Sequence, residues 1–92
     1  MEQLAVLRQK IDEIDQEIQR LFLSRMETVK AIAEFKIAND LSVYDRSRET
    51  AVIDANVSRI AASEYADYYR TVLECVMQVS KEYQKAIVRS TL

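Results

Sequence analysis

The 92-residue sequence contains no glycine and no proline, the two residues that most often end helices and build tight turns. It also has no histidine and a single cysteine, Cys75. An internal disulfide is therefore excluded, and a zinc or iron site would have to be built from carboxylates alone, so we expect no metal site. With 49% apolar residues and so few helix breakers, the composition predicts an all-α fold with few connections.

An excess of one charge is also lacking, because 13 basic and 15 acidic residues leave a net charge of −2. A nucleic-acid-binding domain would show a clear basic excess, so we expect no nucleic-acid partner. Residues 1–3 enter the first helix without a charged leader or an apolar signal region, and no apolar run spans a membrane. We therefore expect a cytoplasmic protein with no membrane partner.

Residues 1–92 are expected to form one small domain. The stretch from Leu4 to Lys36 carries the apolar heptad rows of one long amphipathic helix. A helix over about residues 3–38 would be roughly 50 Å long. A domain of this size cannot cover a helix of that length by itself. Part of the apolar seam should therefore face another chain. The rows are Leu4, Ile11, Ile18 and Ile32, and Leu7, Ile14, Leu21 and Phe35.

Polar residues interrupt this seam in its second half. Arg25 and Thr28 occupy positions where the heptad calls for apolar residues. Lys36 follows Arg25 by eleven residues, so the two cations share one face roughly 16 Å apart. Cations on the apolar side of a helix are costly unless an anion meets them. This half of the helix therefore predicts an anionic partner or ligand.

Two further helices are expected after a break at residues 39–42. The second begins near Asp45, with Ser42 or Asp45 as its N-cap, and the third covers about residues 64–90 with Ser63 as its N-cap. Polar residues again stand on otherwise apolar faces: Asp45, Arg48 and Glu49 in the second helix, and Ser80 and Gln84 in the third. The remaining notable side chains are interpreted as packing residues, namely Tyr65, Tyr68, Tyr69, Tyr83 and Cys75.

Each of these polar residues has a simpler explanation when taken alone. Asp45 would be a helix cap, and Arg48 and Glu49 would form a solvated helix start. Ser80 would bond to its own backbone, and Gln84 would cover the edge of a core. Polar interruptions on all three helices instead favour a shared cavity. Its excess of cations would suit a small ligand with carboxylates.

Arg8 lies about 25 Å along the first helix from Arg25, too far to share a site within one chain. An antiparallel dimer with its two-fold axis near residues 19–20 would change this. It would place Arg8 of one chain beside residues 30–32 of the other, between Arg25 and Lys36. The predicted homodimer therefore makes each site composite.

Several segments together resemble the all-α chorismate mutases. Residues 7–15, 23–26 and 32–36 resemble the first helix of that family, and residues 43–49 and 80–84 match its V-x-D-x-x-R-E and S-x-x-x-Q segments. The resemblance covers nearly the whole chain. It implies three helices per chain in an intertwined antiparallel homodimer, and conversion of chorismate to prephenate for phenylalanine and tyrosine biosynthesis. It also implies that no cofactor is needed.

The resemblance implies eight site residues. Lys36 and Gln84 would be catalytic, because both reach the ether oxygen where negative charge develops. Arg25, and Arg8 from the other chain, would bind carboxylates. The remaining residues would bind substrate. Glu49 would accept a hydrogen bond from the ring hydroxyl of the substrate, Asp45 would offer its backbone N–H, and Arg48 and Ser80 would be carboxylate or orienting contacts.

Two alternatives remain at this point. An isochorismate pyruvate lyase on the same fold would share Arg25, Lys36 and Gln84. The mutase is favoured because Asp45, Arg48 and Glu49 complete the hydroxyl-binding end. The other alternative is a non-catalytic helical dimer, or a regulatory module that holds a partner enzyme. The cations of the first helix argue against it, since a silent protein has no reason to bury them. No companion enzyme of the aromatic pathway is specified by the sequence.

Overall fold

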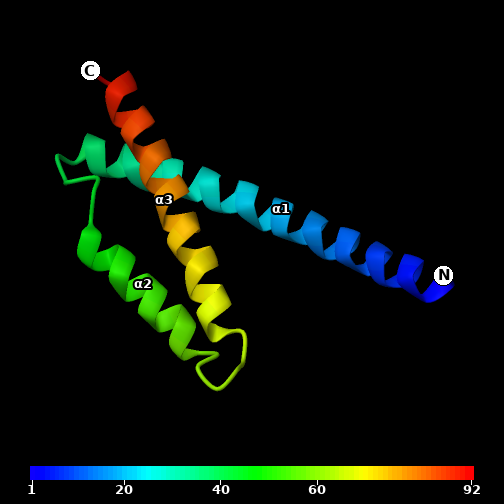
Figure 1. Cartoon of the computed structure of the whole chain (residues 1–92). Coiled ribbons are helices and arrows are strands. Elements are labelled where there is room, and N and C mark those ends of the chain that lie inside the picture. Colours follow the sequence, from blue (N-terminus) through cyan, green and yellow to red (C-terminus); the bar gives the residue numbers. More distant parts are fainter.

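The computed structural model describes residues 1–92 and consists of three helices without a strand (Figure 1). Helix α1 spans Glu2–Ala38, α2 spans Arg46–Ser58 and α3 spans Ala66–Ser90. The predicted all-α class is therefore confirmed, and the bounds of α1 agree with the prediction to within a residue. None of the three helices combines the length and the apolar character that crossing a membrane requires.

Helix α1 ends in a Schellman motif that is built without glycine. Asp40 has a φ of 56°, in the left-handed region, and its N–H donates to the carbonyl of Ile37. The N–H of Leu41 donates to the carbonyl of Lys36 at 2.8 Å, which closes the motif. The break lies within residues 39–42, as expected, and the left-handed residue is Asp40, since Asn39 before it has a φ of −110°. The chain reverses at this point and leads into α2.

Helix α2 begins where its cap was expected. The Asp45 carboxylate accepts a hydrogen bond from the backbone N–H of Arg48 at 3.0 Å, so Asp45 is the N-cap. Ser42 is not the cap, because its hydroxyl donates to the carbonyl of Tyr44. Helix α3 begins two residues later than predicted. Ser63 accepts from the backbone N–H of Tyr65 within a run of turns, and the helix starts only at Ala66.

Helix α3 is the element that holds the others together, because α1 and α2 both contact it (Figure 1). An ion pair between Arg70 and Asp54, 3.2 Å long, also joins α3 to α2. Only seven of the 92 residues are buried, so a single chain forms a small core. The buried side chains are Val29, Ala33, Val43, Val57, Leu73, Met77 and Ser80.

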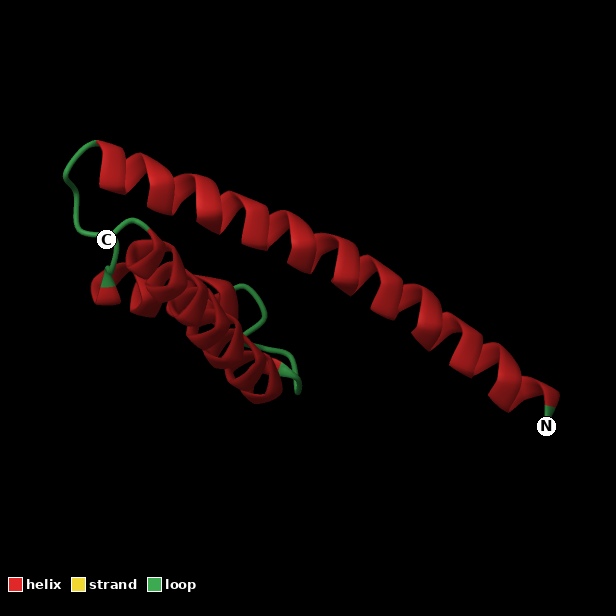
Figure 2. Cartoon of the chain, turned by 90° about the horizontal axis from the view of Figure 1, so that it is seen from above, coloured by secondary structure: helices red, strands yellow, loops and turns green.

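The N-terminal half of α1 has no neighbour within the chain. Figure 2 shows it extending away from the other helices, and the molecule measures 57 × 28 × 15 Å. The seam residues between Leu4 and Leu21 are 37–58% exposed, which agrees with the expectation that the chain cannot cover them itself. The packing interpretation is wrong within one chain for Tyr65, Tyr68 and Cys75. All three side chains are exposed, so the rest of the chain does not cover them.

Candidate active site

A cavity of about 440 Å³ lies where the three helices meet. Its apolar wall comes from Val29, Ile32, Val43, Val52 and Met77. The rest of its lining consists of seven of the eight predicted site residues, which come from all three helices and the α2 cap. A shared cavity was predicted for these seven because they interrupt the apolar faces of three helices, and the structure brings them together. They are Arg25, Lys36, Asp45, Arg48, Glu49, Ser80 and Gln84.

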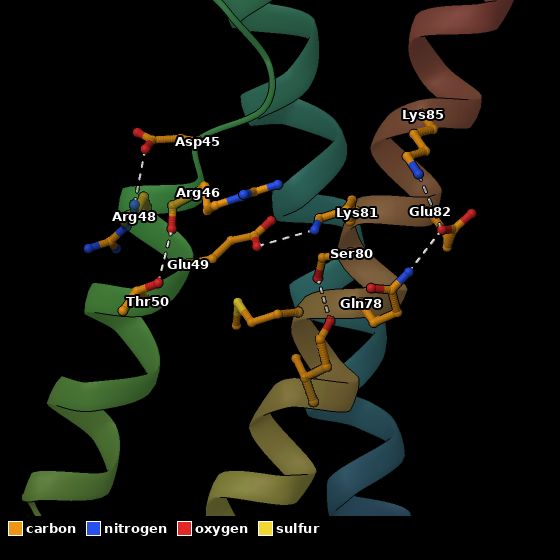
Figure 3. A network of polar contacts seen from close by, with 12 residues as sticks. Asp45, Arg46, Arg48, Glu49, Thr50, Gln78, Ser80, Lys81, Glu82 and Lys85 are labelled. Carbon is orange, nitrogen blue, oxygen red and sulfur yellow. Dashed lines mark hydrogen bonds and ion pairs between the residues drawn. The ribbon is translucent and has the colours of Figure 1, made fainter.

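Arg25 is held by α3. Its guanidinium donates one hydrogen bond to the hydroxyl of Ser80 and a second, 3.9 Å long, to the sulfur of Met77. Ser80 is buried, and its own hydroxyl proton goes to the carbonyl of Val76 at 2.9 Å (Figure 3). The hydroxyl is thus back-bonded to its helix and also accepts from Arg25. Ser80 therefore orients a cation rather than offering a free donor to the cavity.

Lys36 and Gln84 line the cavity with their polar groups unused. Lys36 takes part in none of the four ion pairs of the chain, and the Gln84 amide makes no hydrogen bond within it. Both side chains are half-buried. A cation and a neutral amide donor are therefore available to a ligand from opposite elements, α1 and α3.

The first turn of α2 contributes three charged side chains. Asp45 is committed to its cap, and Glu49 is paired with Lys81 on α3 at 3.5 Å (Figure 3). Arg48 is exposed at the rim, and in Figure 3 its side chain extends from α2 on the side away from α3. Arg48 has no carboxylate partner. Both carboxylates of the cavity therefore have a favourable partner, whereas none of its cations is paired with a carboxylate.

The charge pattern of the cavity follows from these contacts. Arg25, Lys36 and Arg48 lack any ion pair within the chain. These three unpaired side chains leave the lining with an excess of positive charge. A small ligand with more than one carboxylate would neutralise it. The cavity volume falls within the range of about 300–1,000 Å³ that is usual for small-molecule sites.

Arg8 is the one predicted site residue that the structure does not bring to the cavity. It is exposed on the free half of α1, seventeen residues before Arg25 and so about 25 Å away along the helix. This position matches the expectation that one chain cannot bring Arg8 to its own site. Its contribution from a second chain stays a prediction.

Thr28 was grouped with the cations, and this interpretation is wrong. It is exposed, and its hydroxyl donates to the carbonyl of Ser24. A straight helix drifts by about 20° per heptad relative to a seven-residue repeat. By the fourth heptad the row containing Thr28 has turned outward, and Val29 and Ala33 face the core instead.

Lys81 was missed as a partner of Glu49. It directly follows Ser80, and its ammonium reaches from α3 to α2. Spacing along one helix does not determine which residues face each other across two helices, so no pattern in the sequence pointed to this pair.

A family model described as chorismate mutase type II matches residues 7–85. The chain belongs to the type II chorismate mutase family. The domain is thus of the chorismate mutase class, an isomerase of aromatic amino acid biosynthesis, so the resemblance and the functional class predicted from the sequence are confirmed.

Two curated relatives of this chorismate mutase domain agree with the family. It is 29% identical over 92 residues to a chorismate mutase from Methanocaldococcus jannaschii, with 100% of this chain and 90% of that protein covered. It is 35% identical over 81 residues to the T-protein of Haemophilus influenzae, with 87% of this chain but only 22% of the T-protein covered. The chain thus spans about a fifth of the T-protein. No solved structure matches it.

Proposed function

We propose that this chorismate mutase domain rearranges chorismate to prephenate in the cavity between its three helices, with each site completed by Arg8 of a second chain. The observation that carries the proposal is the cavity itself. Three helices bring seven residues of the expected types to one space of about 440 Å³, with unpaired cations and a free amide. This arrangement suits a small dianion.

The reaction occurs within one molecule, since the ether C–O bond breaks as a new C–C bond forms. No group is transferred, so it requires no nucleophile and no cofactor. The protein contributes by holding the substrate in a compact chair-like form and by stabilising the charge that develops. Arg25 and Arg8 of the second chain would each bind a carboxylate through two parallel N–H donors.

Lys36 and Gln84 would act on the ether oxygen, which gains negative charge as its bond to carbon breaks. Both are free of other partners in the structure, and they face the cavity from α1 and α3. A preorganised donor aimed at developing charge contributes about 3–4 kcal/mol, or roughly 10²–10³ in rate. These two residues are therefore assigned the catalytic role.

The remaining residues divide into substrate contacts and positioning groups. Glu49 would accept the ring hydroxyl of the substrate, and Asp45 would present its backbone N–H at the start of α2. Arg48 at the rim would turn inward to meet a carboxylate. Ser80 would act through Arg25, because its proton is already given to the Val76 carbonyl.

The homodimer would form through the free half of α1. Its exposed apolar residues, from Leu4 to Leu21, offer a continuous seam to a second copy. An antiparallel pairing with its axis near residues 19–20 would carry Arg8 to residues 30–32 of the other chain. A single domain over residues 1–92 and a cytoplasmic location are parts of the same proposal.

The decisive test is incubation of the protein with chorismate, with loss of its absorbance and formation of prephenate measured together. Isochorismate is offered in parallel, and pyruvate release is assayed. Prephenate formation from chorismate is the expected result. Pyruvate from isochorismate as the dominant product would support the lyase instead, and no turnover of either substrate would indicate a non-catalytic helical protein.

A further inference from the structure

Glu49 lies between two hollows. Besides the main cavity, a smaller hollow of about 330 Å³ opens between the start of α2 and the last turns of α3. Glu49 is the one residue that lines both. Its carboxylate can therefore meet a ligand on one side and another group on the opposite side. The other residues around the smaller hollow are Tyr44, Arg46, Lys81 and Lys85.

Lys81 contacts Glu49 from the smaller hollow. Its ammonium lies 3.5 Å from Oε2 of Glu49, and the two side chains are 30% and 25% exposed, the least of any ion pair in the chain. Lys81 does not line the main cavity, whereas its neighbour Ser80 does. Figure 3 shows Lys81 reaching across from α3 toward Glu49 on α2. Lys81 thus approaches the carboxylate from outside the main cavity.

The main cavity needs such a partner for Glu49. Three unpaired cations line the same space, and a free carboxylate among them would pair with one of them. That pairing would occupy a cation intended for a substrate carboxylate and would withdraw Glu49 from the substrate hydroxyl. The pair with Lys81 engages Oε2 and leaves Oε1 available.

We propose that Lys81 is a positioning residue, which holds the Glu49 carboxylate away from the cavity cations and presents its second oxygen to the substrate hydroxyl. The inference rests on the proposed function, since it requires chorismate in the main cavity. Lys81 acts through Glu49 and does not itself contact the substrate. Its loss therefore affects substrate binding more than the bond rearrangement.

The test compares Lys81→Met with Lys85→Met. Lys85 lines the same hollow but pairs with Glu82 at 3.6 Å, so its loss removes the same charge without releasing Glu49. For Lys81→Met we expect KM for chorismate to rise about fivefold with kcat within twofold, because the loss of a partly buried ion pair costs about 1 kcal/mol. Lys85→Met should keep the KM of the wild type, and Lys81→Arg should restore it.

A Glu49→Gln background distinguishes action through Glu49 from direct contact. There Lys81→Met should add nothing to KM, because the pair no longer exists. An equal rise in both backgrounds would overturn the inference, as would an unchanged KM in Lys81→Met alongside an active wild type. Circular dichroism confirms the helices, and Lys81→Gln replaces the Met variant if that one unfolds. An inactive wild type would overturn the proposed function and this inference together.

Discussion

The two halves of α1 continue one apolar pattern but meet different surroundings. Near its C-terminal end, Val29 and Ala33 pack against α3, and Arg25 and Lys36 face the cavity. Over the first two-thirds of the helix no residue is buried, and this part of α1 extends away from the other helices (Figure 2). The packed half positions cations for a ligand, whereas the free half presents an apolar seam to solvent. The difference teaches that a heptad pattern specifies a contact face without specifying which chain supplies the contact.

The largest expected effect lies in the packed half. Lys36→Ala should lower kcat/KM for chorismate by roughly 10²–10³, because it removes a donor to the developing charge on the ether oxygen. Lys30→Ala, on an exposed position of the same helix, is the matched control. Steady-state kinetics with circular dichroism measure the effect. Turnover near that of the wild type would remove Lys36 from the site.

The free half is tested by Ile18→Glu. Ile18 is 58% exposed in the chain and lies next to the proposed two-fold axis, so two such carboxylates would face each other across the dimer. We expect at least about 100-fold weaker self-association, since burying like charges together costs several kcal/mol. Analytical ultracentrifugation measures this effect, with Gln16→Glu as control. A variant that stays dimeric would place the interface elsewhere.

Mixing two inactive variants tests whether the free half of α1 in one chain completes the site in another. In a homodimer of Arg8→Ala chains both sites lack Arg8, and in a homodimer of Lys36→Ala chains both sites lack Lys36. A heterodimer would hold one intact site of two, so an equal mixture that exchanges freely should regain about a quarter of the activity of the wild type. Activity after refolding the chains together measures the recovery, and native mass spectrometry verifies the exchange. No recovery despite exchange would show that Arg8 does not complete a site in another chain.

Within α1 and its contacts, the smallest effect is expected for Ser80→Ala. Arg25 would keep its charge but lose the hydroxyl that orients it, and hydrogen bonds to charged groups contribute about 1.5–3 kcal/mol. We expect kcat/KM to fall by about tenfold or slightly more, with the helices intact. Ser90→Ala removes a comparable back-bonded hydroxyl far from the cavity. Equal kinetics in both variants would leave Ser80 without a role beyond packing.

Most of the fold was predictable because its signals are local. The heptad rows identified α1, and Asp45, three residues before the N–H it caps, located the start of α2. Ser63 misled the prediction for α3, since a serine that orders a turn has the same local pattern as a helix cap. Local chemistry does not distinguish the two when the following residues continue in turns.

For the candidate site, the residues that line the cavity were predictable, but the contacts between helices were not. Interrupted apolar faces pointed to the residues that now line the cavity, because a polar group on such a face needs a partner. The pair of Lys81 with Glu49 and the outward turn of Thr28 were not predictable in this way. Both depend on the rotation and offset of one helix against another, which periodicity along each helix leaves undetermined.

The small core of the single chain also affects its stability. With seven buried residues of 92, a separate chain has little apolar burial to offset the entropy of ordering three helices. In the proposed dimer, association supplies the missing free energy, so folding and assembly form one equilibrium governed by mass action. Each tenfold dilution then costs about 1.4 kcal/mol of dimer stability, and the amount of protein present becomes part of what keeps the enzyme folded.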